Sequence, residues 1–111
     1  IALASDYRIM REDRGYFCLP EVDLGMVLIP SMNALVCGKL AGKDLRDALL
    51  VGARLAGPDL VQRGVFDQCC ALDQLIEQAQ NAAQPMIGKN RQALQGLKRG
   101  INGSILAFID S

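Results

Sequence analysis

The sequence predicts an α/β chain that is mainly helical. Strand-like apolar runs occur mostly in the first third, at residues 7–10 and 16–19. From Pro30 onwards, apolar residues recur mainly at the three- and four-residue spacing of helices that bury one face. Together these patterns favour a short strand-containing segment followed by packed helices.

The first third contains three expected strands. Residues 1–5 form an apolar run with no initiator Met and no polar lead-in, which indicates the middle of a buried strand in a longer protein. Residues 7–10 and 16–19 are two further strands joined by a charged turn. Pro20 holds Leu19 extended and ends the last of them.

Helices dominate the rest of the sequence. Pro30 and Ser31 mark a helix start. Expected helices follow at residues 45–51, 58–63 and 72–83, ending respectively at Gly52, Gly64 and Pro85, and a last one at residues 93–101. Glycines inside the last helix weaken it by about 1 kcal/mol each relative to alanine. Residues 65–67 read as one more short strand.

Charge and cysteine content exclude several functions. Twelve basic and twelve acidic residues give a net charge of zero, so no basic surface is expected to attract nucleic acid. No apolar stretch is long enough to span a membrane. The four cysteines lack a zinc-site spacing and the chain has no histidine, so we expect packed thiols in a reducing compartment and no metal.

Glu21 is the strongest candidate for chemistry. It follows Pro20 in an apolar run that ends at Gly25, and without histidine any acid–base chemistry near neutral pH falls to a carboxylate, cysteine or lysine. Desolvation of a carboxyl group favours its neutral form and suits it to proton transfer. On spacing alone, a role in capping a turn or pairing with an arginine is favoured over a catalytic role for Glu21.

Several separated motifs resemble the enoyl-CoA hydratase/isomerase (crotonase) superfamily. The similarity is carried by residues 2–10, 19–25, 50–54, 57–60 and 63–67, in the family's order and spacing. It covers residues 1–85 well and the last helix loosely. The resemblance implies a spiral of strand–strand–helix turns, with residues 1–70 in the C-terminal part of the spiral core and residues 71–111 in a helical region that makes trimer contacts.

The resemblance also assigns a role to Glu21, which matches the family's catalytic glutamate. Members of the family bind acyl-CoA thioesters and stabilise an enolate oxygen with two backbone N–H groups. A hydratase uses a second glutamate. That glutamate and the oxyanion glycine would align upstream of Ile1, so the resemblance implies a fragment that is inactive alone.

Residues 30–35 favour the Δ3-Δ2-enoyl-CoA isomerase branch over the hydratase branch, because they replace the glycine-rich stretch of hydratases. Hydratase and a non-catalytic binding module remain as alternatives. The implied partners are an acyl-CoA substrate and further copies of the chain in a trimer or hexamer. No cofactor is expected beyond the coenzyme A of the substrate, and bacterial cytoplasm, mitochondrion and peroxisome all stay open as intracellular compartments.

Basic residues could contact the coenzyme A phosphates, although a solvated surface role is favoured for each. These candidates are Arg11, Arg14, Lys89, Arg91, Lys98 and Arg99.

Overall fold

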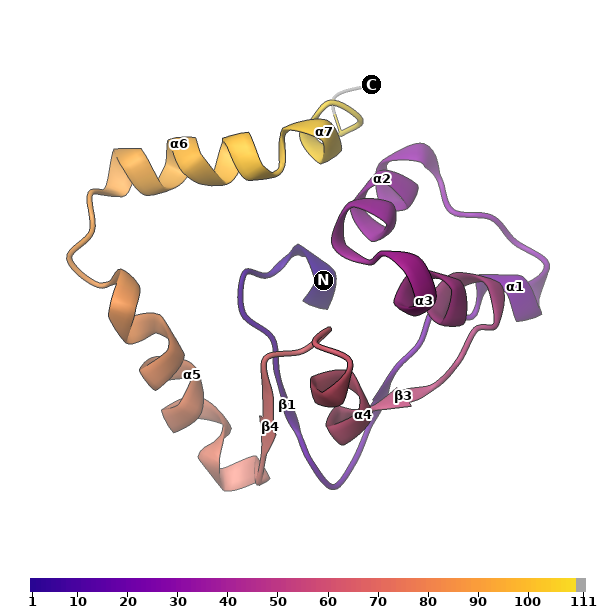
Figure 1. The fold of residues 1–111 in the computed structure, drawn as a ribbon, viewed down its shortest axis with the longest axis horizontal. Helices are drawn as coiled ribbons and strands as arrows, with labels where there is room; N and C mark the ends of the chain where they lie inside the picture. The colour runs from indigo at the N-terminus through magenta and orange to yellow at the C-terminus, as the bar shows by residue number, and fades with distance from the viewer. Residues whose placement is uncertain (110–111) are drawn as a thin grey trace.

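Two small sheets join segments that are far apart in the sequence. The computed structural model describes residues 1–109. The strands are β1 (Ile9–Arg11), β2 (Tyr16–Phe17), β3 (Leu55–Ala56) and β4 (Gln68–Cys70). Strands β1 and β4 run parallel, whereas β2 and β3 are antiparallel. A parallel pair needs a long crossover connection, and here that connection contains most of the helices in the first two thirds of the chain (Figure 1).

Helical segments make up most of the remainder. The α-helices are α1 (Glu21–Leu24), α2 (Pro30–Lys39), α3 (Gly42–Leu45), α4 (Gly57–Gln62), α5 (Leu75–Ala83), α6 (Arg91–Ile101) and α7 (Gly103–Leu106). A π-helical segment, η2 (Arg46–Leu50), continues α3, and 3₁₀ turns occur at η1 (Ala2–Ala4), η3 (Leu72–Gln74) and η4 (Gln84–Met86). The helix start at Pro30 and the stops at Gly52 and Gly64 are confirmed, both glycines having a positive φ.

The core gathers apolar side chains from η1, α2, η2, β3 and α4. Leu60 is fully buried and Val36 is 2% exposed. Phe17 packs edge-on against Phe66, with ring centroids 6.1 Å apart, and so connects the small antiparallel sheet to this core. The buried cluster comprises Leu3, Val36, Leu40, Ala48, Leu55, Leu60, Val65 and Phe66.

Arg8 fastens the beginning of the chain to the segment after α4. Its guanidinium donates to the carbonyl oxygens of Ala2 at 2.9 Å, Leu3 at 3.1 Å and Val65 at 2.8 Å. Its backbone N–H donates to Asp67 Oδ2 at 2.8 Å. One arginine therefore satisfies three carbonyl groups that no regular sheet would pair.

The C-terminal helices form an arc on the side of the molecule away from α1 (Figure 1). The Asn90 side chain caps α6 by accepting from the Ala93 N–H at 2.9 Å. Helix α7 then returns to α2, where Ile105 is buried beside Gly38. The assignment of residues 1–70 and 71–111 to two functional regions stays a prediction, and residues 110–111 of the second region lie outside the described residues.

Two expected strands are absent from the described structure. Residues 1–5 contain the 3₁₀ turn η1 instead, with only Leu3 buried and Ile1 fully exposed. Residues 65–67 form a turn, because the N–H groups of Val65 and Phe66 donate back to the Leu60 carbonyl at the end of α4. The strand begins after that turn, at Gln68.

Candidate active site

Glu21 is the first residue of α1, directly after Pro20. Its carbonyl oxygen accepts from the N–H groups of Gly25 and Met26, so the residues that follow this one-turn helix are hydrogen-bonded to its first residue. Gly25 adopts φ +68°, a conformation that suits glycine and closes the turn. The local sequence therefore fixes the backbone of Glu21 without using its side chain.

The Glu21 carboxylate has an unusual environment. Its Oε2 atom is buried and has no hydrogen-bond partner, and within residues 1–109 Glu21 forms no ion pair with an arginine. Among residues 1–109, this is the only buried side-chain nitrogen or oxygen atom left without a partner. A buried polar atom without a partner is uncommon in proteins and is typical of strained or catalytic positions.

Glu21 is one of the residues that line a cavity of about 260 Å³. This cavity lies between α1, the loop after α1, the start of α2 and the π-helical segment η2. Apart from Glu21 and Asn33, every lining side chain is apolar. The lining residues are Glu21, Val22, Met26, Val27, Leu28, Asn33, Leu49 and Leu50. An apolar cleft with a few convergent polar groups is the usual form of a small-molecule site.

Helix α1 rests against the turn that follows η2. A Cβ atom placed at Gly52 would lie 3.0 Å from Asp23 Oδ2 and 3.1 Å from Val22 Cγ1. On the other side of Glu21, the Cys18 thiol donates to the Gly52 carbonyl oxygen at 3.5 Å. No local sequence pattern signals this contact, because the partners are about thirty positions apart.

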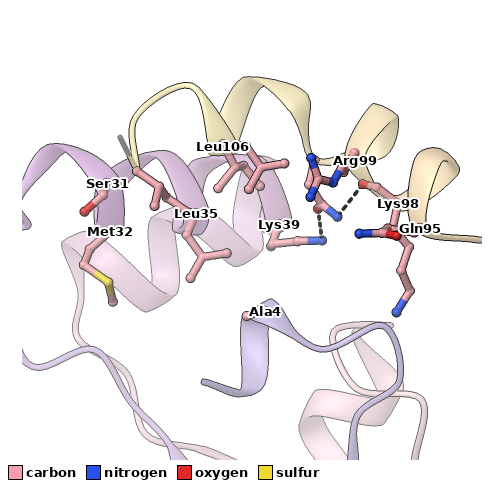
Figure 2. Close-up of a pocket in the computed structure, with 12 residues that line it drawn as sticks. Ala4, Ser31, Met32, Leu35, Lys39, Gln95, Lys98, Arg99 and Leu106 are labelled. Carbon is pink, nitrogen blue, oxygen red and sulfur yellow. Dashed lines mark hydrogen bonds between the residues drawn. The ribbon is translucent and has the colours of Figure 1, made fainter. Parts of the chain in front are cut away.

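A second cavity, of about 400 Å³, lies between α2, α6, α7 and η1 (Figure 2). Two of the basic candidates for coenzyme A contact, Lys98 and Arg99, lie at its edge. Lys98 forms an ion pair with Asp6, and Lys39 donates to Asn102 Oδ1 at 2.8 Å. Neither Lys98 nor Arg99 lines the cavity that includes Glu21, so the structure does not bring these candidates together with the candidate acid–base residue.

The remaining basic candidates are scattered. Arg11 pairs with Asp13 at 2.8 Å on the surface, and Lys89 and Arg91 flank the start of α6. Arg14 lies in the turn between β1 and β2. They form no common phosphate-binding cluster in the described part of the chain.

The cysteines are free thiols. Burial raises the pKa of Cys70, which keeps this thiol neutral. Cys37 is exposed rather than packed, contrary to the expectation for this position. Within residues 1–109, no group of three or more cysteine, aspartate and glutamate side chains is placed to hold a metal ion.

Comparison with known proteins identifies the family. The sequence model of the enoyl-CoA hydratase/isomerase family matches residues 1–105, which is nearly the whole chain. The chain belongs to the enoyl-CoA hydratase/isomerase family. The match includes helix α6 and reaches into α7. It therefore extends beyond the sequence motifs, which all lie in the first two thirds of the chain.

Curated relatives carry the isomerase name. The chain is 40% identical over 67 residues to enoyl-CoA delta isomerase 3 of Arabidopsis thaliana, and 37% identical over 68 residues to the peroxisomal enoyl-CoA delta isomerase 2 of the same plant. Each alignment covers 60% of this chain and 28% of the relative.

Solved structures confirm the crotonase fold. Human mitochondrial Δ3-Δ2-enoyl-CoA isomerase superposes with a TM-score of 0.84 at 21% identity. The superposition covers 97% of this chain and 43% of the human enzyme's chain. An enoyl-CoA hydratase from Mycobacterium marinum superposes with a TM-score of 0.80 at 20% identity, covering 98% and 50%. The chain thus spans half or less of these enzymes, and isomerase and hydratase share its architecture.

No helix in the described part of the chain is both long enough and apolar enough to cross a bilayer.

Proposed function

We propose that the protein containing this chain is a Δ3-Δ2-enoyl-CoA isomerase of fatty-acid oxidation in which Glu21 moves the proton. The observation that carries this proposal is the buried, unpartnered Oε2 of Glu21 beside an apolar cavity. The curated relatives named as enoyl-CoA delta isomerases support the choice of reaction.

The proposed reaction uses one carboxylate twice. Glu21 removes a proton from C2 of a 3-enoyl thioester, and the electron pair of the C2–H bond is delocalised onto the thioester oxygen as an enolate. The same carboxyl group then returns the proton to C4. The double bond moves from C3–C4 to C2–C3, where it is conjugated with the thioester, and no water is consumed.

The part of the cavity lining that this chain supplies suits isomerisation, which needs no bound water. Val22, Leu28 and Leu49 offer no hydrogen bond that could hold an attacking water, and Asn33 is the only other polar side chain of the cavity. Exclusion of water also strengthens the electrostatic interactions of the enolate. The two N–H groups that stabilise this oxygen are expected upstream of Ile1, as are any further carboxylates.

The proposal includes an acyl-CoA substrate, no separate cofactor, and self-association of the full-length protein. It leaves the compartment open between bacterial cytoplasm, mitochondrion and peroxisome. The activity belongs to the full-length protein, and we expect the 111-residue chain alone to be inactive.

Product analysis tests the proposed reaction. The full-length protein is supplied with a 3-enoyl-CoA and, separately, with a 2-enoyl-CoA, and the products are identified by mass spectrometry and NMR. We expect the 3-enoyl-CoA to become 2-enoyl-CoA without a change in mass. Accumulation of 3-hydroxyacyl-CoA from 2-enoyl-CoA, with 3-enoyl-CoA unchanged, would identify a hydratase; no conversion of either would identify a non-catalytic member.

A further inference from the structure

Gly52 touches the polypeptide on both sides of Glu21. Its carbonyl oxygen accepts from Cys18 Sγ, three residues before Glu21, at 3.5 Å. Its α-carbon faces Val22 and Asp23, the two residues after Glu21, so closely that a Cβ there would lie 3.0–3.1 Å from their side chains. A single backbone position therefore supports both flanks of the candidate acid–base residue.

The side chains of helix α1 contribute little to holding it in place. It is one turn long, has no buried residue, and has no side-chain cap at its N-terminus. Leu24 and Val22 are 64% and 46% exposed, so burial of α1 does not fix its position. A shift of the turn at Gly52, which contacts α1, would therefore move the helix and the Glu21 carboxylate with it.

The segment behind α1 is itself irregular. The π-helical segment η2 ends at Leu50, and Gly52 then adopts φ +66°. The Ala53 N–H donates back to the Asp47 carbonyl at 3.0 Å, which closes the turn around Gly52. π-Helical turns occur frequently beside functional sites, where they reorient the backbone.

We propose that Gly52 is a positioning residue for Glu21: it sets the place of α1, and through α1 the distance between the Glu21 carboxylate and the reacting carbon atoms. This inference rests on the proposed function of Glu21. Proton transfer requires close placement of the carboxylate, so a small displacement of α1 slows the chemical step more than it weakens substrate binding.

Gly64 provides a matched control for Gly52. It also follows a helix and has a positive φ, +76°, so alanine brings the same kind of backbone strain at both positions. A Cβ atom at Gly64 would meet no atom within 4 Å, whereas at Gly52 it would press on α1. Any difference between the two variants therefore reports on the contact with α1.

The experiment compares Gly52→Ala and Gly64→Ala in the full-length protein, with thermal unfolding, kcat and KM measured for a 3-enoyl-CoA. We expect both variants to lose thermal stability. We expect only Gly52→Ala to lower kcat, by about tenfold or more, with KM within about twofold of wild type. A kcat for Gly52→Ala equal to that of Gly64→Ala would overturn the positioning role.

A rescue variant separates steric displacement of α1 from general damage. Truncation of Val22 and Asp23 in the triple variant Gly52→Ala/Val22→Ala/Asp23→Ala removes the atoms that lie 3.1 Å and 3.0 Å from the new Cβ. We expect kcat of the triple variant, relative to Val22→Ala/Asp23→Ala, to recover part of the loss. Absence of any recovery would contradict a route through α1.

If Gly52→Ala does not fold, Cys18→Ala takes its place. This change removes the thiol contact with the Gly52 carbonyl and adds no strain. A several-fold lower kcat at unchanged KM supports the inference, and wild-type kcat overturns it. Glu21→Gln distinguishes the two proposals. Wild-type turnover by Glu21→Gln overturns both of them. If Glu21→Gln is inactive but Gly52→Ala and Gly64→Ala have the same kcat, only the role of Gly52 is overturned.

Discussion

Single polar residues in this chain differ in how fully their hydrogen-bonding groups find partners. The guanidinium of Arg8 satisfies three carbonyl oxygens, and that of Arg63 contacts three carboxylates. Glu21 Oε2, in contrast, is buried without any partner among the described residues. Leaving a buried polar group unpaired costs about 1–3 kcal/mol in general, so such an atom is retained where function requires it.

Arg63 gives a pH-dependent prediction at the residue scale. It contacts Asp47 at 3.0 Å and both Asp44 and Asp59 at 3.2 Å. The hydrogen bonds from Arg63 and then Arg46 lower the pKa of Asp47 below its ordinary value of 3.8. A lowered pKa in the folded state adds stability above the pKa of the unfolded state, and this stability is lost as the pH falls through the folded-state value.

Replacement of Arg63 by Met keeps the apolar stem and removes the charge. We expect Arg63→Met to lower the free energy of unfolding at neutral pH, with the difference from wild type shrinking as the pH falls below 3.8. Urea unfolding at a series of pH values measures this difference. A difference that stays constant down to the acid range would show that the ion pairs do not account for it.

Burial gives a second prediction at this scale. Leu60 is fully buried in the core, whereas Ile76 on α5 is 75% exposed. We expect Leu60→Ala to lower the free energy of unfolding by about 2–5 kcal/mol and Ile76→Ala to change it by less than about 0.5 kcal/mol. Chemical denaturation compares the two variants, and equal losses would contradict the described core.

At the scale of elements, two helical glycines have opposite surroundings. A Cβ atom on Gly38 of α2 would lie 2.9 Å from Ile105 Cδ1 of α7, whereas one on Gly96 of α6 would meet nothing within 4 Å. Gly38 therefore permits the close contact between α2 and α7. Gly96 only weakens its own helix.

Alanine at these two positions should act in opposite directions. We expect Gly38→Ala to destabilise the protein by about 1–3 kcal/mol through overpacking against α7. Gly96→Ala should stabilise it by about 0.5–1 kcal/mol through helix propensity. Thermal unfolding of both variants is the measurement, and stabilisation by Gly38→Ala would mean that α7 does not pack on α2 as described.

The elements also show what the sequence could and could not predict. Helical spacing predicted α2 and α5, and the resemblance singled out Glu21, because these signals are local. The sequence pattern of residues 65–67 wrongly predicts a strand, because no local pattern reveals that the N–H groups of Val65 and Phe66 donate back to the Leu60 carbonyl of α4. The packing of Gly52 behind the one-turn helix α1 depends on contacts between segments about thirty positions apart, so only the structure shows it.

At the scale of the whole molecule, the described chain is more open than a compact domain of its length. Its radius of gyration is 15.4 Å, and it extends over 46 × 38 × 20 Å. A compact chain of this length would have a radius of about 13 Å. Helices α5 and α6 extend as an arc away from the rest of the chain (Figure 1), which explains the larger radius of gyration. On α6, Leu97 and Ile101 are 67% and 77% exposed.

Exposed apolar side chains on α6 predict self-association of the 111-residue chain. Burial of such surface in a partner is favourable by about 25 cal/mol per Å². We expect light scattering to show oligomers or aggregates, and Leu97→Glu/Ile101→Glu to shift the distribution towards the monomer. A monodisperse monomer of 12.0 kDa at high concentration would contradict this expectation.

The central claim concerns the Glu21 carboxylate, and turnover of a 3-enoyl-CoA by the full-length protein tests it most directly. Glu21→Gln keeps the shape of the side chain and removes its basicity. We predict that this variant binds the substrate but forms 2-enoyl-CoA at least about a thousandfold more slowly than wild type. Turnover by Glu21→Gln at the wild-type rate would show that another group moves the proton.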